Sequence, residues 1–167
     1  MEIGLSLGSN LGDRLQNLRE ARRRIGGIPG VSITEQSLVY ETSPVGVNKW
    51  FEHLPFLNAV LVIETNLGPE TIFAEVKEIE RNAGRAGSAD RNAPRPIDID
   101  IIYAGDLSID NGTLSVPHPR WAGRRFVVQP LSDVRPELRL PGEDMTVRNL
   151  LLTLPDDQKV VPCVETW

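Results

Sequence analysis

Alternation between apolar and polar side chains marks the strands that this sequence is expected to form. From residue 97 to residue 101 every odd position is isoleucine, and Asp98 and Asp100 stand between them. Residues 3–8 alternate large aliphatic side chains with glycine and serine. Because successive side chains of a strand point to opposite faces, one face of this first strand is small enough for a helix or a ligand to pack closely on it. Residues 56–64 are largely apolar on both faces, which predicts a central strand.

Two other stretches show the spacing of amphipathic helices. Residues 11–25 carry an apolar stripe, and this helix is expected to begin after Asn10 or Asp13 as its N-cap. A second helix is expected to begin at Pro69, since proline is tolerated in a first turn. Its buried stripe is predicted to consist of Ile72, Val76, Ile79 and Ala83.

The pattern in the rest of the chain is weaker. Residues 31–41 predict one bent strand, residues 105–112 a hairpin turn, and residues 146–154 a short capped helix. Residues 126–131 fit either a helix or an extended segment. The final residues, about 155–167, are expected to form an irregular tail.

The order strand, helix, strand, strand, helix, strand predicts an α+β fold. It is that of a ferredoxin-like α/β sandwich, in which helices cover an antiparallel sheet. Residues 1–167 are expected to form a single domain. Two long polar loops, residues 42–55 and 85–96, are predicted to be active-site loops, and the second is predicted to close over bound ATP.

The composition narrows the class of protein. The chain has 167 residues, of which 40% are hydrophobic and 25% charged, and its net charge of -5 argues against nonspecific nucleic-acid binding. Cys163 is the only cysteine, so no intramolecular disulfide can form. No apolar run approaches the roughly 18 residues of a membrane helix, and we therefore expect a cytoplasmic protein without a membrane or nucleic-acid partner. A small anionic ligand is indicated by a group of arginines without a neighbouring acid: Arg120, Arg124 and Arg125.

Asp98 and Asp100 are the candidate metal ligands. They share one face of the predicted strand, about 6.6 Å apart, and two adjacent carboxylates repel each other unless a cation lies between them. Magnesium prefers such oxygen ligands. A solvated edge strand is the alternative interpretation, but four arginines nearby in sequence favour phosphoryl transfer. These are Arg81, Arg85, Arg91 and Arg95.

Three further side chains leave alternatives open. His118 stands between two prolines, which by itself is more typical of a hydrogen-bonded turn residue than of a catalyst. Phe56 and Asn58 share a strand face and suit a flat heterocycle with a donor and acceptor edge, although core packing fits them equally well. The chain contains no phosphate-binding glycine-rich loop of the G-x-x-x-x-G-K-[ST] type.

Six segments, taken together and in order, resemble the 6-hydroxymethyl-7,8-dihydropterin pyrophosphokinases of folate biosynthesis. Residues 95–100, with the sequence RPIDID, are the most specific of them. The segments cover most of residues 1–150. They are GSNLGD at residues 8–13, YETSPVG at 40–46, FLNA at 56–59, Glu80 with Gly84 and Arg85, APRPIDIDI at 93–101, and VPHP at 116–119 with Arg124 and Phe126.

The resemblance implies that the protein transfers pyrophosphate from ATP to the hydroxymethyl group of the pterin and releases AMP. It implies two Mg²⁺ ions held by Asp98 and Asp100, with Arg85 and Arg95 neutralising charge on the transferred group. The implied pterin-binding residues are Thr42, Val45, Phe56, Asn58 and Phe126. The implied nucleotide-binding residues are Lys77, Glu80, Arg91, Ile101, Ser115, His118 and Arg124.

Two other functions fit the same fold class. A palm-type nucleotidyl transferase also places paired metal-binding aspartates on such a sheet, but it releases pyrophosphate. A non-enzymatic ferredoxin-like domain that binds a small ligand would show no metal-dependent turnover. The pairing of Phe56 and Asn58 with Phe126 favours a pterin, and we expect the protein to act as a monomer.

Overall fold

The computed structural model describes residues 1–44, 54–84, 94–156 and 159–167. Its main sheet has the strand order β5-β1-β4-β3-β8, with β2 paired to β4 beside β3, and a separate two-stranded sheet joins β6 to β7. The strands are β1 (Glu2–Ser9), β2 (Val31–Gln36), β3 (Val39–Thr42), β4 (Phe56–Thr65), β5 (Asp98–Ala104), β6 (Ile109–Asp110), β7 (Ser115–Val116) and β8 (Val160–Val164). The helices are α1 (Arg14–Gly26), α2 (Pro69–Asn82), α3 (Arg125–Val134) and α4 (Val147–Thr153).

The predicted α+β fold is confirmed. Strands β1, β2, β4 and β5 with helices α1 and α2 follow the ferredoxin-like order along the chain. All pairings in the main sheet are antiparallel, and β1 lies between β4 and β5. The small-residue strand at the start of the chain therefore lies inside the sheet, next to the strand that carries the two aspartates.

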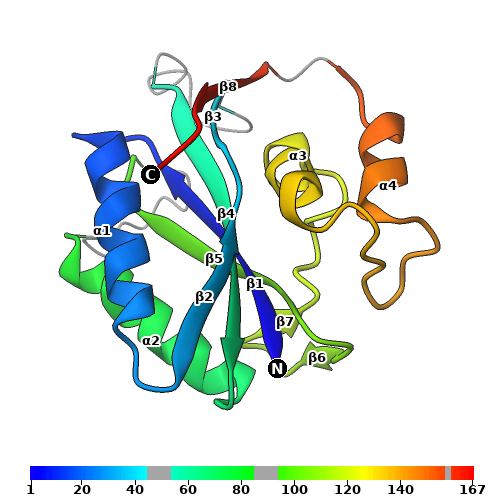
Figure 1. Cartoon of the computed structure of the whole chain (residues 1–167), viewed down its shortest axis with the longest axis horizontal. Helices are drawn as coiled ribbons and strands as arrows, with labels where there is room; N and C mark the ends of the chain where they lie inside the picture. Colours follow the sequence, from blue (N-terminus) through cyan, green and yellow to red (C-terminus); the bar gives the residue numbers. More distant parts are fainter. Residues whose placement is uncertain (45–53, 85–93, 157–158) are drawn as a thin grey trace.

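Helices cover both faces of the sheet (Figure 1). On one face α1 and α2 bury a largely aliphatic core with odd-numbered residues of β1 and β4 and with Ile97, Ile99 and Ile101 at and beside the start of β5. On the other face α3 and α4 bury a second cluster around Val60, Ile102 and other residues. The alternation over residues 97–101 therefore directs its three isoleucines to the first core and its two aspartates to the opposite face.

The prediction of one strand over residues 31–41 is wrong in detail, because the segment forms β2 and β3 with a break between them. At the break, hydrogen bonds made by the backbone and the side chain of Ser37 take the place of regular backbone pairing with β4. Its backbone N–H donates to Val60 O at 2.9 Å, and its hydroxyl accepts from Val60 N–H at 2.8 Å. A side chain thus takes one place in the hydrogen-bond ladder, and the register also shifts between Ile33 and Glu35.

The prediction of an irregular tail over residues 155–167 is also wrong. Strand β8 pairs with β3 at the edge of the sheet, where Pro162 is tolerated because an edge strand has backbone groups without a sheet partner. Trp167 follows it, is 6% exposed, and donates from Nε1 to Ser37 O at 2.9 Å. The end of the chain is therefore anchored to the first core.

Several local predictions are resolved by the same structure. Asp13, not Asn10, is the N-cap of α1, since its side chain accepts from the N–H of Gln16. Ala83 is exposed as the C-cap of α2 and does not extend the buried stripe. The predicted hairpin lies later than residues 105–112, because β6 pairs with β7. Residues 126–131 are helical within α3.

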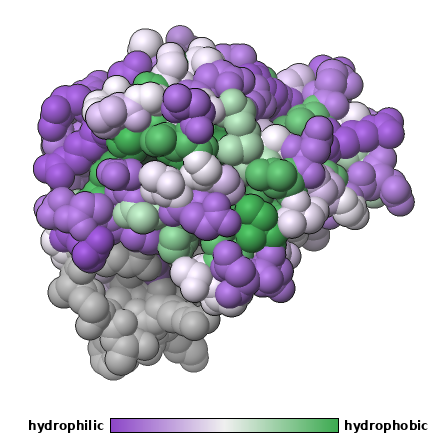
Figure 2. Space-filling model, turned by 90° about the horizontal axis from the view of Figure 1, so that it is seen from below, coloured by the Kyte–Doolittle hydropathy of each residue, from purple (hydrophilic) through white to green (hydrophobic). Residues whose placement is uncertain are grey.

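Hydrophilic side chains cover much of the surface seen in Figure 2, with smaller apolar patches between them. None of the helices in the described ranges is long and apolar enough to cross a membrane.

Candidate active site

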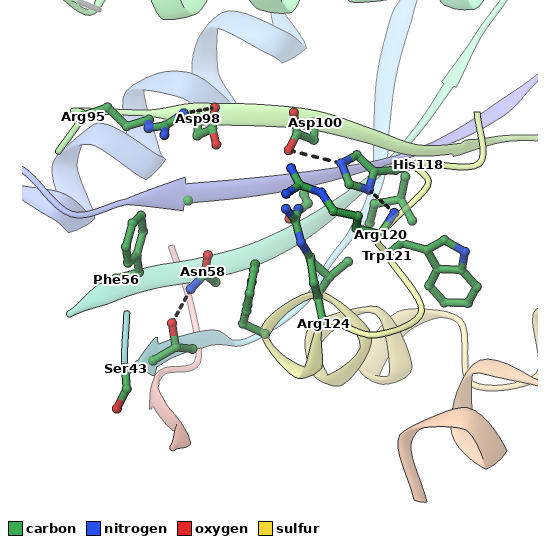
Figure 3. Close-up of a pocket in the computed structure, with 16 residues that line it drawn as sticks. Ser43, Phe56, Asn58, Arg95, Asp98, Asp100, His118, Arg120, Trp121 and Arg124 are labelled. Carbon is green, nitrogen blue, oxygen red and sulfur yellow. Dashed lines mark hydrogen bonds and ion pairs between the residues drawn. The ribbon is translucent and has the colours of Figure 1, made fainter. Parts of the chain in front are cut away.

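A cavity of about 450 Å³ opens on the sheet face that α3 and α4 cover only in part. Strands β1, β4 and β5 form its floor, and the segment from His118 to Val127 forms a wall (Figure 3). Charged, amide and aromatic side chains meet there. The lining residues are Ser6, Gly8, Thr42, Ser43, Phe56, Asn58, Arg95, Asp98, Asp100, Ile102, His118, Arg120, Trp121, Arg124, Phe126 and Val127.

The strand register determines which floor residues are neighbours. Gly8 of β1 pairs with Asp98 of β5 on one side and with Asn58 of β4 on the other. The next row of the same face pairs Asp100 with Ser6. Because Gly8 and Ser6 are small, they leave space above the sheet between the carboxylates and the amide. The small face predicted from residues 3–8 therefore borders a cavity.

Asp98 is held beside Arg95 at one end of the cavity. Arg95 Nη1 donates to Asp98 Oδ1 at 3.1 Å, and the arginine side chain is 15% exposed. The end of β1 fixes the backbone of Arg95, since Asn10 Oδ1 accepts from Arg95 N–H at 2.9 Å and Asn10 N–H donates to Arg95 O at 3.3 Å. Asn10 is 3% exposed. A buried amide thus connects the GSN turn to the start of the aspartate strand.

Asp100 lies between two nitrogen groups. Lys77 Nζ is 3.7 Å from Asp100 Oδ1, and His118 Nε2 is 4.0 Å from Asp100 Oδ2. His118 Nδ1 accepts from Arg120 N–H at 3.1 Å, so the neutral ring carries its proton on Nε2, facing Asp100. Burial lowers the pKa of His118, against the raising effect of Asp100, and Arg124 and Arg120 lower it further.

Lys77 and Glu80 of α2 bind the free edge of β5. Glu80 Oε1 accepts from Ile99 N–H at 2.6 Å, and Lys77 Nζ donates to Ile99 O and to Glu80 Oε1, each at 2.9 Å. Burial raises the pKa of Glu80, while the charge of Lys77 and the Ile99 N–H lower it. This pair replaces a missing neighbouring strand and fixes the part of β5 from which Asp98 and Asp100 project.

Aromatic and amide groups occupy the other end of the cavity. Asn58 is 4% exposed and donates from Nδ2 to Thr42 Oγ1 at 2.6 Å. Phe56 lies two residues before Asn58 on the same face of β4, and Phe126 of α3 also lines the cavity. The guanidinium carbon of Arg124 lies 5.5 Å from the centre of the Phe126 ring. The arrangement fits a flat polar ring held between two aromatic side chains.

The donor set also fits divalent magnesium. Both aspartates present carboxylate oxygens to the cavity, and magnesium is commonly held by one or two carboxylates together with water and substrate phosphates. In the part of the chain that the structure describes, no three acidic, histidine or cysteine side chains gather into a metal cluster.

The cavity brings together Asp98, Asp100, Arg95, Thr42, Phe56, Asn58, His118, Arg124 and Phe126 of the predicted site. Four predicted nucleotide contacts do not line it: Lys77, Glu80, Ile101 and Ser115. Ile101 is 3% exposed within the first core, and Ser115 donates its hydroxyl to Asp110 at 2.9 Å. Arg85, Arg91 and Val45 lie outside the described residues, as does most of each predicted active-site loop.

Sequence reasoning did not assign several lining residues. Arg120 belonged to the arginine group that indicated an anionic ligand, but no role was attached to it individually. Trp121 and Val127 carry no signal that separates them from ordinary core residues. Ser43 follows Thr42, Ser6 belongs to the small face predicted from residues 3–8, and Ile102 reaches the cavity through the position of its strand.

Comparison with known proteins identifies the relatives of this chain. The family model of 7,8-dihydro-6-hydroxymethylpterin-pyrophosphokinase (HPPK) matches residues 4–136. The mitochondrial folate synthesis bifunctional protein of Pisum sativum is 40% identical over 133 residues, which are 80% of this chain and 25% of that protein. The 2-amino-4-hydroxy-6-hydroxymethyldihydropteridine pyrophosphokinase of Bacillus subtilis is 37% identical over 130 residues, 78% of this chain and 75% of that protein.

The chain therefore belongs to the HPPK family. It spans about a quarter of the length of the plant bifunctional relatives. The crystal structure of Plasmodium falciparum HPPK-DHPS with pteroate matches 90% of this chain and 42% of that chain, with a TM-score of 0.70 at 18% identity. That likeness independently shows the fold.

Proposed function

We propose that this protein transfers pyrophosphate from ATP to the hydroxymethyl group of 6-hydroxymethyl-7,8-dihydropterin, giving AMP and the pterin diphosphate for tetrahydrofolate synthesis. One observation carries the proposal. A single cavity combines a carboxylate pair, guanidinium groups, and an aromatic and amide site for a flat ring. Phosphoryl transfer to a heterocyclic alcohol needs these three elements next to each other.

The pterin is assigned to the end formed by Phe56, Asn58 and Phe126. The two phenylalanines hold the ring by stacking, and the Asn58 amide with Thr42 reads its polar edge. Val45 is assigned to the same site on the family resemblance. This placement directs the hydroxymethyl group along the floor towards Asp98 and Asp100, which lie one strand beyond Gly8.

ATP is assigned to the end formed by Asp100, His118 and Arg124. Lys77, Glu80, Ile101 and Ser115 do not line the cavity, so they belong to this assignment on the family resemblance alone, as does Arg91. His118 is held by its own backbone N–H, which donates to Ile102 O at 2.8 Å, so its ring stays next to Asp100. A fixed donor at that place orients a bound phosphate without reorganisation.

Charge on the transferred group is neutralised by Arg95 and, on family resemblance, by Arg85. Arg95 is already oriented by Asp98 and by Asn10, so little conformational entropy is lost when phosphate binds. Asp98 and Asp100 are the proposed ligands of two Mg²⁺ ions. When bound, the ions neutralise phosphate charge and make the acceptor hydroxyl a better nucleophile.

The nucleotide product tests the proposal. The protein is incubated with ATP, Mg²⁺ and hydroxymethyldihydropterin, and the nucleotides are separated by chromatography. Pyrophosphate transfer predicts one AMP for each pterin consumed. Release of inorganic pyrophosphate would instead support a nucleotidyl transferase, and absent turnover would support a binding domain. Nucleotide hydrolysis that does not depend on the pterin would contradict transfer to the pterin.

A further inference from the structure

Two guanidinium groups, those of Arg120 and Arg124, share the wall of the cavity that faces the aspartates. Both line the cavity, and Figure 3 shows them side by side, directed towards Asp100. Arg124 is the residue before α3, and Arg120 lies in the turn that precedes it. Two positive charges held together repel each other unless an anion lies between or beside them.

Neither guanidinium forms an ion pair with a carboxylate within the described ranges. Other arginines of the same region do, since Arg95 pairs with Asp98 and Arg125 pairs with Asp156. Arg124 instead lies over the Phe126 ring. Burial lowers the pKa of Arg124 and the positive charge of Arg120 lowers it further, whereas the more distant charges of Asp100 and Asp98 raise it. The two carboxylates offset part of the positive charge without a direct ion pair, so the guanidinium hydrogen-bond donors remain open to an anionic ligand.

The turn that carries the two side chains is hydrogen-bonded within itself. Arg120 N–H donates to His118 Nδ1, and Arg124 N–H donates to Trp121 O at 3.1 Å. Trp121 is 4% exposed within the second core. Packing of the tryptophan thus keeps both arginines at the cavity although they repel each other, which is the arrangement of a preformed anion site.

We propose that Arg120 is a phosphate-binding residue that acts with Arg124 as a clamp of two guanidinium groups on the phosphate chain of the nucleoside triphosphate. The proposal rests on the proposed function for the placement of ATP. Guanidinium groups bind phosphate oxygens through two parallel hydrogen bonds, and a pair of them spans adjacent phosphates. The phosphate chain then lies between this wall and the carboxylates of Asp98 and Asp100.

The test compares Arg120→Ala with Arg120→Lys and with Arg19→Ala, an exposed arginine on α1 that serves as control for the loss of one positive charge. Calorimetry measures binding of a nonhydrolysable ATP analogue with Mg²⁺, of inorganic tripolyphosphate, and of hydroxymethylpterin. Thermal unfolding of the unliganded proteins is measured in parallel. This second readout separates a ligand-binding role from a structural role.

Arg120→Ala should weaken binding of the analogue and of tripolyphosphate by about tenfold to a hundredfold, since hydrogen bonds to charged groups are lost. Pterin binding should stay unchanged. The unliganded Tm should be equal or higher, because a repulsion is removed. Arg120→Lys should fall between, since a point charge replaces the planar fork, and Arg19→Ala should match the wild type.

Unchanged binding of both phosphate ligands to Arg120→Ala would overturn the clamp, and so would a lower Tm with equal losses for phosphate and pterin ligands. The proposed function can fail separately. Arg120-dependent binding of tripolyphosphate without any transfer to the pterin would leave the clamp in place and remove the pyrophosphokinase. A wild-type protein that binds neither the analogue nor tripolyphosphate would overturn both.

Discussion

At the scale of single residues, the cavity depends on a row of side chains across three strands. Asp98, Gly8 and Asn58 are neighbours in this row, so the carboxylate and the amide face each other across a residue without a side chain. The positions of these three residues are set by backbone pairing between the strands and do not depend on a bound ligand. Substitutions in the row should therefore change function with little effect on the fold.

Replacing Asp98 or Asp100 with alanine should lower turnover by about 100-fold or more, because an oxygen ligand of the proposed ions is lost where charge develops. Circular dichroism and thermal unfolding should stay close to those of the wild type, since both side chains lie on the cavity face. Ile99→Asp is the matched contrast, because it places an unpaired charge at a position that is 0% exposed and should unfold the protein. Near-normal turnover of both alanine variants would falsify the assignment of the metal ligands.

Gly8→Ala tests the space above the row. A Cβ atom at Gly8 would lie 3.0 Å from Asn58 Oδ1 and 3.8 Å from Phe56 Cδ1, so the amide would have to move from its place beside Thr42. We expect pterin binding to weaken by about tenfold, since small displacements of orienting groups have effects of this order or larger. Affinity for the ATP analogue should be retained. Equilibrium titration with each ligand measures the two effects.

Gly68→Ala is the control for this substitution, because the nearest atom to its added Cβ is 3.6 Å away and the residue is the N-cap of α2. Equal pterin affinity of Gly8→Ala and the control would contradict the placement of the pterin on Asn58.

Which side chains of residues 97–101 face the core and which face the site was predictable, because the alternation of a strand determines its two faces without knowledge of the fold. The same pattern placed Phe56 and Asn58 together on β4. Arg120 could not be assigned in this way, since the direction of its side chain follows from the packing of Trp121 beneath its turn. Ile101 was assigned to the nucleotide site by the family resemblance alone, and the structure places its side chain in the first core.

At the scale of secondary-structure elements, α3 is held at both ends. Its start carries Arg124 and Phe126 into the cavity, and Arg135 follows its last residue. Arg135 donates to both oxygens of Glu2 on β1, at 2.7 Å from Nη2 to Oε2, and Tyr103 of β5 donates its hydroxyl to Glu2 Oε1 at 2.6 Å. The helix that forms the cavity wall is thereby fixed to the strands that form its floor.

Glu2→Gln should reduce the free energy of unfolding by about 1.5–3 kcal/mol at neutral pH, the range for hydrogen bonds to charged groups. The hydrogen bond from Arg135 is the main cause that lowers the pKa of Glu2 below 4.5. A lowered folded-state pKa stabilises the protein above the unfolded-state pKa, and this contribution is lost as the pH falls through the folded-state value.

The difference in unfolding free energy between wild type and Glu2→Gln should therefore shrink as the pH falls below about 4.5. Denaturant titrations at pH 7, 5, 4 and 3 measure it. Glu75→Gln, at an exposed position of α2, supplies the control for loss of one carboxylate. A difference that stays constant over this pH range would contradict the role of the Glu2–Arg135 ion pair.

Trp167 should be essential to strand β8. Trp167→Ala should destabilise the protein by about 3–5 kcal/mol, the range for loss of a large buried aromatic side chain. Trp167→Phe retains most of the ring but loses the hydrogen bond to Ser37 O, and should cost about 1 kcal/mol. Val161→Ala, in the same strand at 43% exposure, should cost less than either. Denaturant unfolding ranks the three, and an alanine variant at position 167 as stable as wild type would contradict the anchoring.

The elements that sequence analysis missed or misplaced share a physical cause. Strand β8 has three valines, but it is short and interrupted by a proline, so the strand signal of its own sequence is weak and pairing with β3 stabilises it. The break between β2 and β3 depends on a serine hydroxyl that replaces a backbone partner. Helix α3 contains Pro130, which weakened the helical pattern of residues 126–131. Each outcome was decided by contacts distant in sequence.

At the scale of the whole molecule, one face of the sheet is used for the main core and the other for the cavity. The face under α1 and α2 is filled by a continuous aliphatic core, whereas the other face is shared between a smaller core and the cavity. The ferredoxin-like order of β1, α1, β2, β4, α2 and β5 was predictable from their periodicity. The second layer was not, because two short helices connected by irregular segments carry little periodic signal.

The central claim is that this cavity holds the pterin and the phosphates side by side. A crystal structure of the protein with hydroxymethylpterin, Mg²⁺ and a nonhydrolysable ATP analogue tests it most directly. We predict the pterin ring between Phe56 and Phe126 with its polar edge on Asn58, and the phosphate chain between the aspartates and the guanidinium groups of Arg120 and Arg124. A pterin bound elsewhere, or phosphates that contact neither wall, would contradict the account.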